Sequence, residues 1–160
     1  MFNLSISLNS FYFYLFLLYF FLSGFYDLKK KTVPTILHII FMLSGLPFFI
    51  NFQVRELSCQ EYTLLIDILL RFIPGIILTA ISIISGGNIG IGDAIFITVS
   101  AFYIPFNYIL MLAISGFLSA FMVSMAILIY GKISGKDYHN MTLPFIPLML
   151  PGLFLFLNGF

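Results

Sequence analysis

Charged residues are scarce in this sequence. Only 8% of its 160 residues are Asp, Glu, Lys or Arg, whereas 61% are hydrophobic, and the mean hydropathy is +1.12. A chain with so little polar surface cannot cover a water-soluble globule. We therefore expect the chain to be embedded in the lipid bilayer, which is then both its solvent and a binding partner.

The scarcity of cysteine and of clustered basic residues excludes two further classes of site. Cys59 is the single cysteine, so neither an intrachain disulfide nor a paired-cysteine zinc site can form. His38 lies in an apolar run and His139 in a polar segment, where packing and surface roles are expected. The net charge is only +1, and no basic patch predicts a nucleic-acid partner. We expect no metal and no cofactor.

Long apolar runs predict an all-α integral membrane protein of about six transmembrane helices in a single domain, residues 1–160. The expected spans are 2–26, 33–50, 62–85, two spans of roughly 17–20 residues within 93–130, and 143–157. Pro105-Phe106-Asn107 is the expected turn inside 93–130. Pro34 is expected in the first turn of the second span, where proline is tolerated, and Pro74-Gly75 is expected to kink the third.

The basic residues predict how these spans are oriented. Lys29, Lys30 and Lys31 follow the first apolar run, whereas a secretory signal would have its basic residues before that run. Positive charge collects on the cytoplasmic side, so the N-terminus is predicted outside. Alternation of the spans then places both termini outside and five of the seven basic residues inside. It also places the glycine-rich segment before the fourth helix on the cytoplasmic side.

This glycine-rich segment, Ser85–Asp93, ends in an aspartate at the start of the fourth span. An intramembrane carboxylate is costly and commonly marks a functional site, so Asp93 is a candidate. Gly90 and Gly92 lack a Cβ where the backbone bends or where another group comes close. The structural alternative is that Asp93 merely N-caps the following helix.

A second aspartate is predicted at the same membrane depth. Asp27 is at the cytoplasmic end of the first span, and Asp93 is at the cytoplasmic start of the fourth. Two carboxylates that meet in a poorly solvated site cannot both ionise cheaply, so the pair keeps one proton. Such a pair can deprotonate a water and polarise a carbonyl, which is aspartyl proteolysis. The structural alternative for Asp27 is a surface ion pair with Lys30 or Lys31.

Three segments resemble the motifs of the type IV prepilin peptidases. Asp27–Pro34 is similar to the first motif, an aspartate followed by basic residues and an aliphatic-proline pair. Gly86–Asp93 resembles the second, glycine-any-glycine-aspartate. Leu143–Pro147 with Gly152 is similar to the proline-phenylalanine-any-proline segment of the last core helix. The chain departs from many bacterial members at Thr35, where they have asparagine, and at Ala94-Ile95-Phe96, where they have a lysine.

The resemblance implies a membrane aspartyl endopeptidase with Asp27 and Asp93 as its catalytic pair and with Gly90, Gly92 and Pro34 supporting the motifs. Its substrate would be the leader of a prepilin-like protein, namely a pilin, pseudopilin or archaellin-like chain. Cleavage would occur at the cytoplasmic face of the cell membrane. No paired-cysteine region precedes the first span, so peptidase activity without methyltransferase activity is expected. The length is similar to that of the minimal members of the family.

Two other functions compete with this interpretation. A non-enzymatic transporter or secretion-system subunit would have polar residues through the membrane depth or an internal repeat, and neither is evident. A presenilin-like or signal-peptide-peptidase-like intramembrane protease shares the glycine motif, but its fold is larger. Asp67 and Arg71 form the other intramembrane polar pair. They are spaced to share a helix face near the outer end of the third span, where a structural or partly snorkelling ion pair is expected.

Overall fold

A computed structural model describes residues 2–56, 61–85, 90–135 and 142–158, with side chains from residue 11 onward except 52–65 and 67. This part of the chain is helical and contains no strand, as the all-α prediction requires. The helices are α1 (Phe2–Lys30), α2 (Thr35–Glu56), α3 (Glu61–Ile84), α4 (Ile91–Ser100), α5 (Phe106–Ser134), α6 (Phe145–Leu148) and α7 (Leu150–Asn158).

Two of the described helices are long and apolar enough to cross a membrane. They are Phe11–Lys30 of α1, with a mean hydropathy of 1.4, and Phe106–Ser134, which is α5, with a mean hydropathy of 2.3. Large apolar side chains are exposed along α5, and examples are Leu118, Phe121 and Met122 at 60–65% exposure. Such a surface is unfavourable in water and suits lipid.

The region between Asp93 and Tyr130 is divided less evenly than predicted. At 1.5 Å per residue, α4 is only about 15 Å long, whereas a bilayer core is about 30 Å thick. Helix α5 takes 29 residues. The prediction of two comparable spans is therefore wrong, although the break itself falls at Pro105, whose extended backbone N-caps α5. No charged residue lies at the end of α4. The hydropathy of the sequence therefore predicted the total length of this apolar region but not the position at which it is divided.

The last predicted span, 143–157, is also interrupted. It forms α6 and α7 with a break at Met149. Pro147 and Pro151 are four residues apart, and Pro151 has no N–H to donate to the carbonyl of Pro147. One intrahelical hydrogen bond is lost there, and the proline ring crowds the same carbonyl.

The connection between α1 and α2 begins with a residue in an unusual conformation. Lys31 has φ 53° and donates its N–H to the carbonyl of Asp27 at 2.8 Å, which ends α1 in a left-handed cap. Pro34 lies just before α2 instead of inside its first turn as predicted. Its carbonyl accepts the N–H of Leu37 at 2.9 Å.

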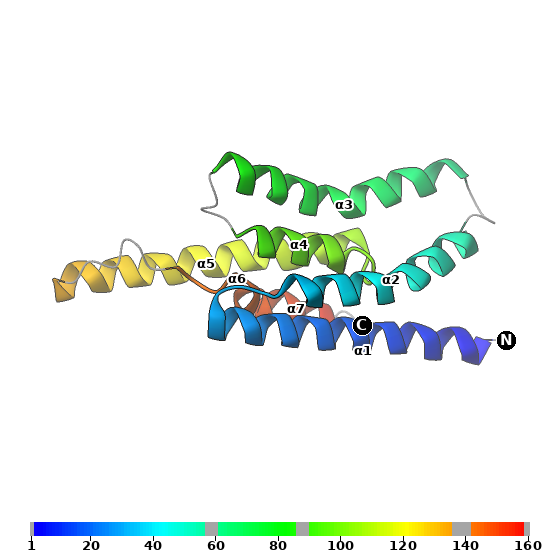
Figure 1. Cartoon of the computed structure of the whole chain (residues 1–160), viewed down its shortest axis with the longest axis horizontal. Helices are drawn as coiled ribbons and strands as arrows, with labels where there is room; N and C mark the ends of the chain where they lie inside the picture. The colour runs from blue at the N-terminus through cyan, green and yellow to red at the C-terminus, as the bar shows by residue number, and fades with distance from the viewer. Residues whose placement is uncertain (1, 57–60, 86–89, 136–141, 159–160) are drawn as a thin grey trace.

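The helices form a bundle with their long axes roughly aligned, with α3 at one edge and α1 at the other (Figure 1). Helix α4 packs between α3 and α2, α6 packs on α1, and α7 packs on α5. Gly75 allows α4 to approach α3, because a Cβ at Gly75 would lie 3.0 Å from the Cα of Thr98. The Pro74-Gly75 pair was predicted only to kink α3, but its glycine makes this contact possible.

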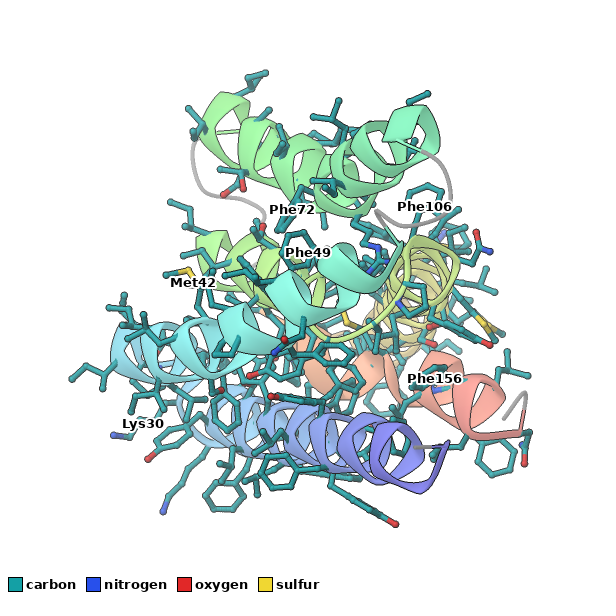
Figure 2. All side chains as sticks on the ribbon, turned by 90° about the vertical axis from the view of Figure 1, so that its right-hand side faces the viewer. Lys30, Met42, Phe49, Phe72, Phe106 and Phe156 are labelled. Carbon is teal, nitrogen blue, oxygen red and sulfur yellow. The ribbon has the colours of Figure 1, made fainter. Side chains whose placement is uncertain are left out.

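Aromatic side chains fill much of the interior. Phe49 of α2 and Phe72 of α3 point toward each other (Figure 2), with ring centroids 5.7 Å apart. Each also packs against Phe102, which follows α4. Tilted and edge-to-face arrangements of this kind stabilise aromatic pairs beyond the burial of their area. They hold α2 and α3 to the C-terminal end of α4, and hence fix the helix that carries Asp93.

Candidate active site

Asp27 occupies the last turn of α1 and is buried, with 6% of its surface exposed. The backbone N–H of Ile146 donates a hydrogen bond of 3.0 Å to its Oδ2. Within the described part of the chain, no ion pair joins Asp27 to Lys30 or Lys31. The structure therefore does not support the alternative in which Asp27 forms a surface ion pair, because its carboxylate faces the interior.

The partner of Asp27 lies at the start of α6. Pro144 is extended, and the helix begins at Phe145, so the N–H of Ile146 belongs to a first turn that has no acceptor within its own helix. The carboxylate of Asp27 supplies this acceptor. Lys31 adds a second connection, because its Nζ donates to Oγ1 of Thr142 at 2.9 Å. The first and third segments of the predicted motif set therefore meet in space.

Asp93 is the third residue of α4 and is partly exposed. The N-cap of α4 is Gly90, and no side chain forms a cap hydrogen bond. The alternative in which Asp93 N-caps the helix is therefore wrong. A carboxylate in a first helical turn is nevertheless favourable, because the helix dipole is positive there.

The two glycines beside Asp93 have different surroundings. A Cβ built on Gly90 would lie 2.8 Å from Oδ2 of Asp93, closer than a real Cβ atom approaches another group. A Cβ on Gly92 would meet nothing within 4 Å. The expectation that a missing Cβ admits a neighbouring group thus applies to Gly90 and not to Gly92. Residues 86–89 of this glycine-rich segment lie outside the described residues.

Asp27 and Asp93 belong to the first and second segments of the motif set and lie at the same end of the bundle. Figure 1 shows the C-terminal end of α1 and the N-terminal end of α4 on one side of the molecule. Asp93 lies close enough to Asp27 for a negative charge on one carboxylate to disfavour a negative charge on the other. The structure thus brings together the two carboxylates that the sequence paired, with the third predicted segment beside Asp27.

A buried polar cluster lies next to this pair, and the sequence interpretation missed it. The hydroxyl of Tyr19 in α1 is 2.6 Å from Nδ1 of His38 in α2, and both side chains are buried. Ser23 is also buried and lies one turn from each of Tyr19 and Asp27. A signal was present, because Tyr19, Ser23 and Asp27 recur every four residues and so share one helix face. His38 is inside the protein, as expected, but is more than an inert packing residue.

The remaining polar candidates lie elsewhere or outside the described residues. Arg71 of α3 is buried, with 4% of its surface exposed, so it does not snorkel. The side chain of Asp67, and all of Cys59 and His139, lie outside the described residues. Among the side chains that are described, no group of three His, Cys, Asp or Glu could hold a metal ion.

Comparison of the chain with models of protein families, with curated proteins and with solved structures found no match.

Proposed function

We propose that the protein is a membrane aspartyl endopeptidase that removes the leader peptide of type IV prepilin-like proteins. One observation carries the proposal: Asp27 and Asp93, 66 positions apart in sequence, lie at the same end of the bundle with their charges interacting. Two acids in an apolar protein are costly. A joint catalytic role for the two neighbouring carboxylates gives a chemical reason for the protein to bear that cost.

The location of the third segment supports the same proposal. Proline-phenylalanine-any-proline was identified from the sequence by resemblance alone, yet the N–H of Ile146 within it binds Asp27. This bond holds the carboxylate of Asp27 against the third segment.

In the proposed mechanism, the pair shares one proton. The ionised carboxylate takes a proton from a water as the water oxygen attacks the scissile carbonyl, while the protonated carboxyl donates to the carbonyl oxygen. Collapse of the tetrahedral intermediate breaks the C–N bond, and the proton taken from the water passes to the leaving amine. Activity requires one ionised and one protonated acid, so its pH profile is bell-shaped, with limits that belong to the pair.

The membrane arrangement belongs to the proposal as well. We propose about six membrane-embedded helical segments with the N-terminus outside and the aspartate pair at the cytoplasmic face of the cell membrane. The exposed lysines Lys29, Lys30 and Lys31 beside Asp27 support this orientation, because basic residues favour the cytoplasmic side. A prepilin-like substrate would present its cleavage site there, where its own apolar helix meets the headgroups.

The test is leader cleavage of prepilin-like proteins from the same genome, each co-expressed with this chain and followed by a mobility shift. We expect cleavage by the wild type and none by Asp27→Asn or Asp93→Asn. Asparagine is nearly isosteric with aspartate and keeps an oxygen that can accept the N–H of Ile146. Glu56→Gln, at the last residue of α2, is the matched acid-to-amide control and should retain cleavage.

Each result has a clear meaning for the proposal. Cleavage that survives either aspartate substitution would refute the paired mechanism. Loss of cleavage in Glu56→Gln as well would indicate that any acid-to-amide change disables the protein, which would remove the support for a special pair. No cleavage of any prepilin-like protein by a well-folded wild type would count against this substrate class.

A further inference from the structure

Helix α6, whose N–H binds Asp27, is held between two longer helices. It packs on α1 and on α5 (Figure 1). On the α1 side its neighbour is Gly24, where a Cβ would lie 3.8 Å from Ile146 and 3.9 Å from Pro147. On the α5 side its neighbour is Gly116, which is buried. The position of α6, and hence that of its N–H groups, depends on both contacts.

The contact with Gly116 is much closer than the contact with Gly24. A Cβ on Gly116 would lie 2.7 Å from Cγ of Met149, and 3.2 and 3.4 Å from two ring carbons of Phe145. Phe145 is the first residue of α6 and Met149 directly follows its last, so both ends of this short helix rest on one glycine. Met149 is fully buried, and the ring of Phe145 also packs against Phe117 with centroids 5.0 Å apart. Close-packed side chains of this kind have little room to move away.

We propose that Gly116 is a positioning residue that lets α6 lie where the N–H of Ile146 bonds the carboxylate of Asp27. A methyl group on Gly116 would have to push its carbon neighbours back by roughly 0.5–1 Å to reach the usual separation. Because both ends of α6 rest on Gly116, the whole helix would move. A shift of that size exceeds the tolerance of the 3.0 Å bond to Asp27, since N–H···O distances range only over about 2.7–3.2 Å.

The catalytic consequence rests on the proposed peptidase activity. The bond from Ile146 holds the carboxylate of Asp27 in place, and a misplacement of about 1 Å at a reacting group can cost about 10²-fold in rate. Gly116 acts through α6 and not on the substrate. Gly116→Ala should therefore lower kcat for leader cleavage by about 10- to 100-fold and leave KM unchanged.

The matched control is Gly24→Ala. It adds the same methyl group on the other side of α6, at ordinary van der Waals distances, and should leave both kcat and KM unchanged. A general loss of folded protein lowers the amount of active enzyme in proportion, so rates are compared per folded molecule. Equal kcat values for Gly116→Ala and Gly24→Ala would overturn the proposal.

A spectroscopic measurement tests the positioning of α6 without any cleavage assay. Labelling with ¹³C at phenylalanine carbonyls and ¹⁵N at isoleucine selects the amides of isoleucines that follow phenylalanine, which are Ile50, Ile73, Ile97 and Ile146. A bond to a carboxylate shifts an amide proton downfield, so Asp27→Ala should move the Ile146 signal upfield. We expect Gly116→Ala to move it in the same direction and Gly24→Ala to leave it near its wild-type position. A wild-type Ile146 signal in Gly116→Ala would overturn the proposal, whereas the expected shift in a wild type that cleaves no leader would refute only the proposed function.

A second variant covers the case in which Gly116→Ala does not fold. Met149→Ala removes Cγ, the atom nearest to the added methyl group. The double variant Gly116→Ala/Met149→Ala should therefore fold and recover the Ile146 signal at least in part. A double variant that stays unfolded would show that α6 is not the obstacle to a side chain at Gly116, and it would overturn the proposal.

Discussion

Replacing Gly75 with alanine tests the packing that positions α4. A Cβ at this position would lie 3.0 Å from both Cα and Cβ of Thr98, and closer still to its Oγ1. Carbon atoms prefer separations of about 3.5–4.0 Å, so α4 would have to move away by roughly 0.5–1 Å. Rotating Thr98 does not relieve the contact, because its Cα belongs to the backbone and its Oγ1 already bonds the carbonyl of Ala94 at 2.9 Å.

The expected magnitude follows from two opposing effects. Overpacking of this kind costs about 1–3 kcal/mol. Alanine is more favourable than glycine inside a helix by up to about 1 kcal/mol, which offsets part of that cost. We therefore expect Gly75→Ala to destabilise the protein by roughly 1 kcal/mol in thermal or denaturant unfolding in detergent. It should also slow leader cleavage, because α4 carries Asp93.

Gly24→Ala is the matched control. Its Cβ would lie 3.8 Å from Ile146 and 3.9 Å from Pro147, which are ordinary van der Waals distances. This variant should gain up to about 1 kcal/mol from helix propensity. Equal stabilisation by Gly24→Ala and Gly75→Ala would refute the close approach of α3 and α4. Partial recovery in Gly75→Ala/Thr98→Ala, measured as non-additivity, would identify Thr98 as the obstacle.

Three further substitutions have definite expected outcomes. Gly90→Ala should reduce the leader-cleavage rate without changing the unfolding midpoint, because φ −63° and ψ 125° suit alanine but its Cβ displaces the carboxylate of Asp93. A displacement of about 1 Å can cost about 10²-fold in rate, and a wild-type rate would contradict the contact. Lys31→Gly should relieve the left-handed backbone, worth about 1 kcal/mol, whereas Thr142→Val only removes the bond to Lys31. In thermal unfolding, Lys31→Gly should therefore be the more stable of the two variants, and the reverse order would contradict the strain argument.

Local sequence patterns predicted the bounds of the helices well where charged, polar or proline residues interrupt the apolar runs. The described parts of α1, α2 and α3 begin and end within a few residues of the predicted spans except at the C-terminal end of α2, which extends to Glu56. Prediction failed between Asp93 and Tyr130, where an uncharged apolar run gives no local sign that α4 stops at Ser100. In the last segment a sign existed, because Pro151 has no N–H to donate to the carbonyl of residue 147. The six-span topology and its orientation stay predictions.

For the site, the sequence paired Asp27 with Asp93 through an argument that needs only span direction and charge. Both acids lie at one end of the bundle because successive antiparallel helices bring the chain back to that end. The different surroundings of Gly90 and Gly92 could not be read from the motif. These surroundings depend on the orientation of the side chain of Asp93.

By itself, then, the sequence determined that the chain is helical and apolar and that Asp27 and Asp93 lie near helix ends. These properties depend on residues within one or two turns of each other. The tertiary structure alone decided that the N–H of Ile146 binds Asp27 and that Tyr19 meets His38 across two helices. Such contacts join segments 119 and 19 residues apart. They are set by where the α1–α2 connection and the broken C-terminal helices direct the chain, which no local pattern specifies.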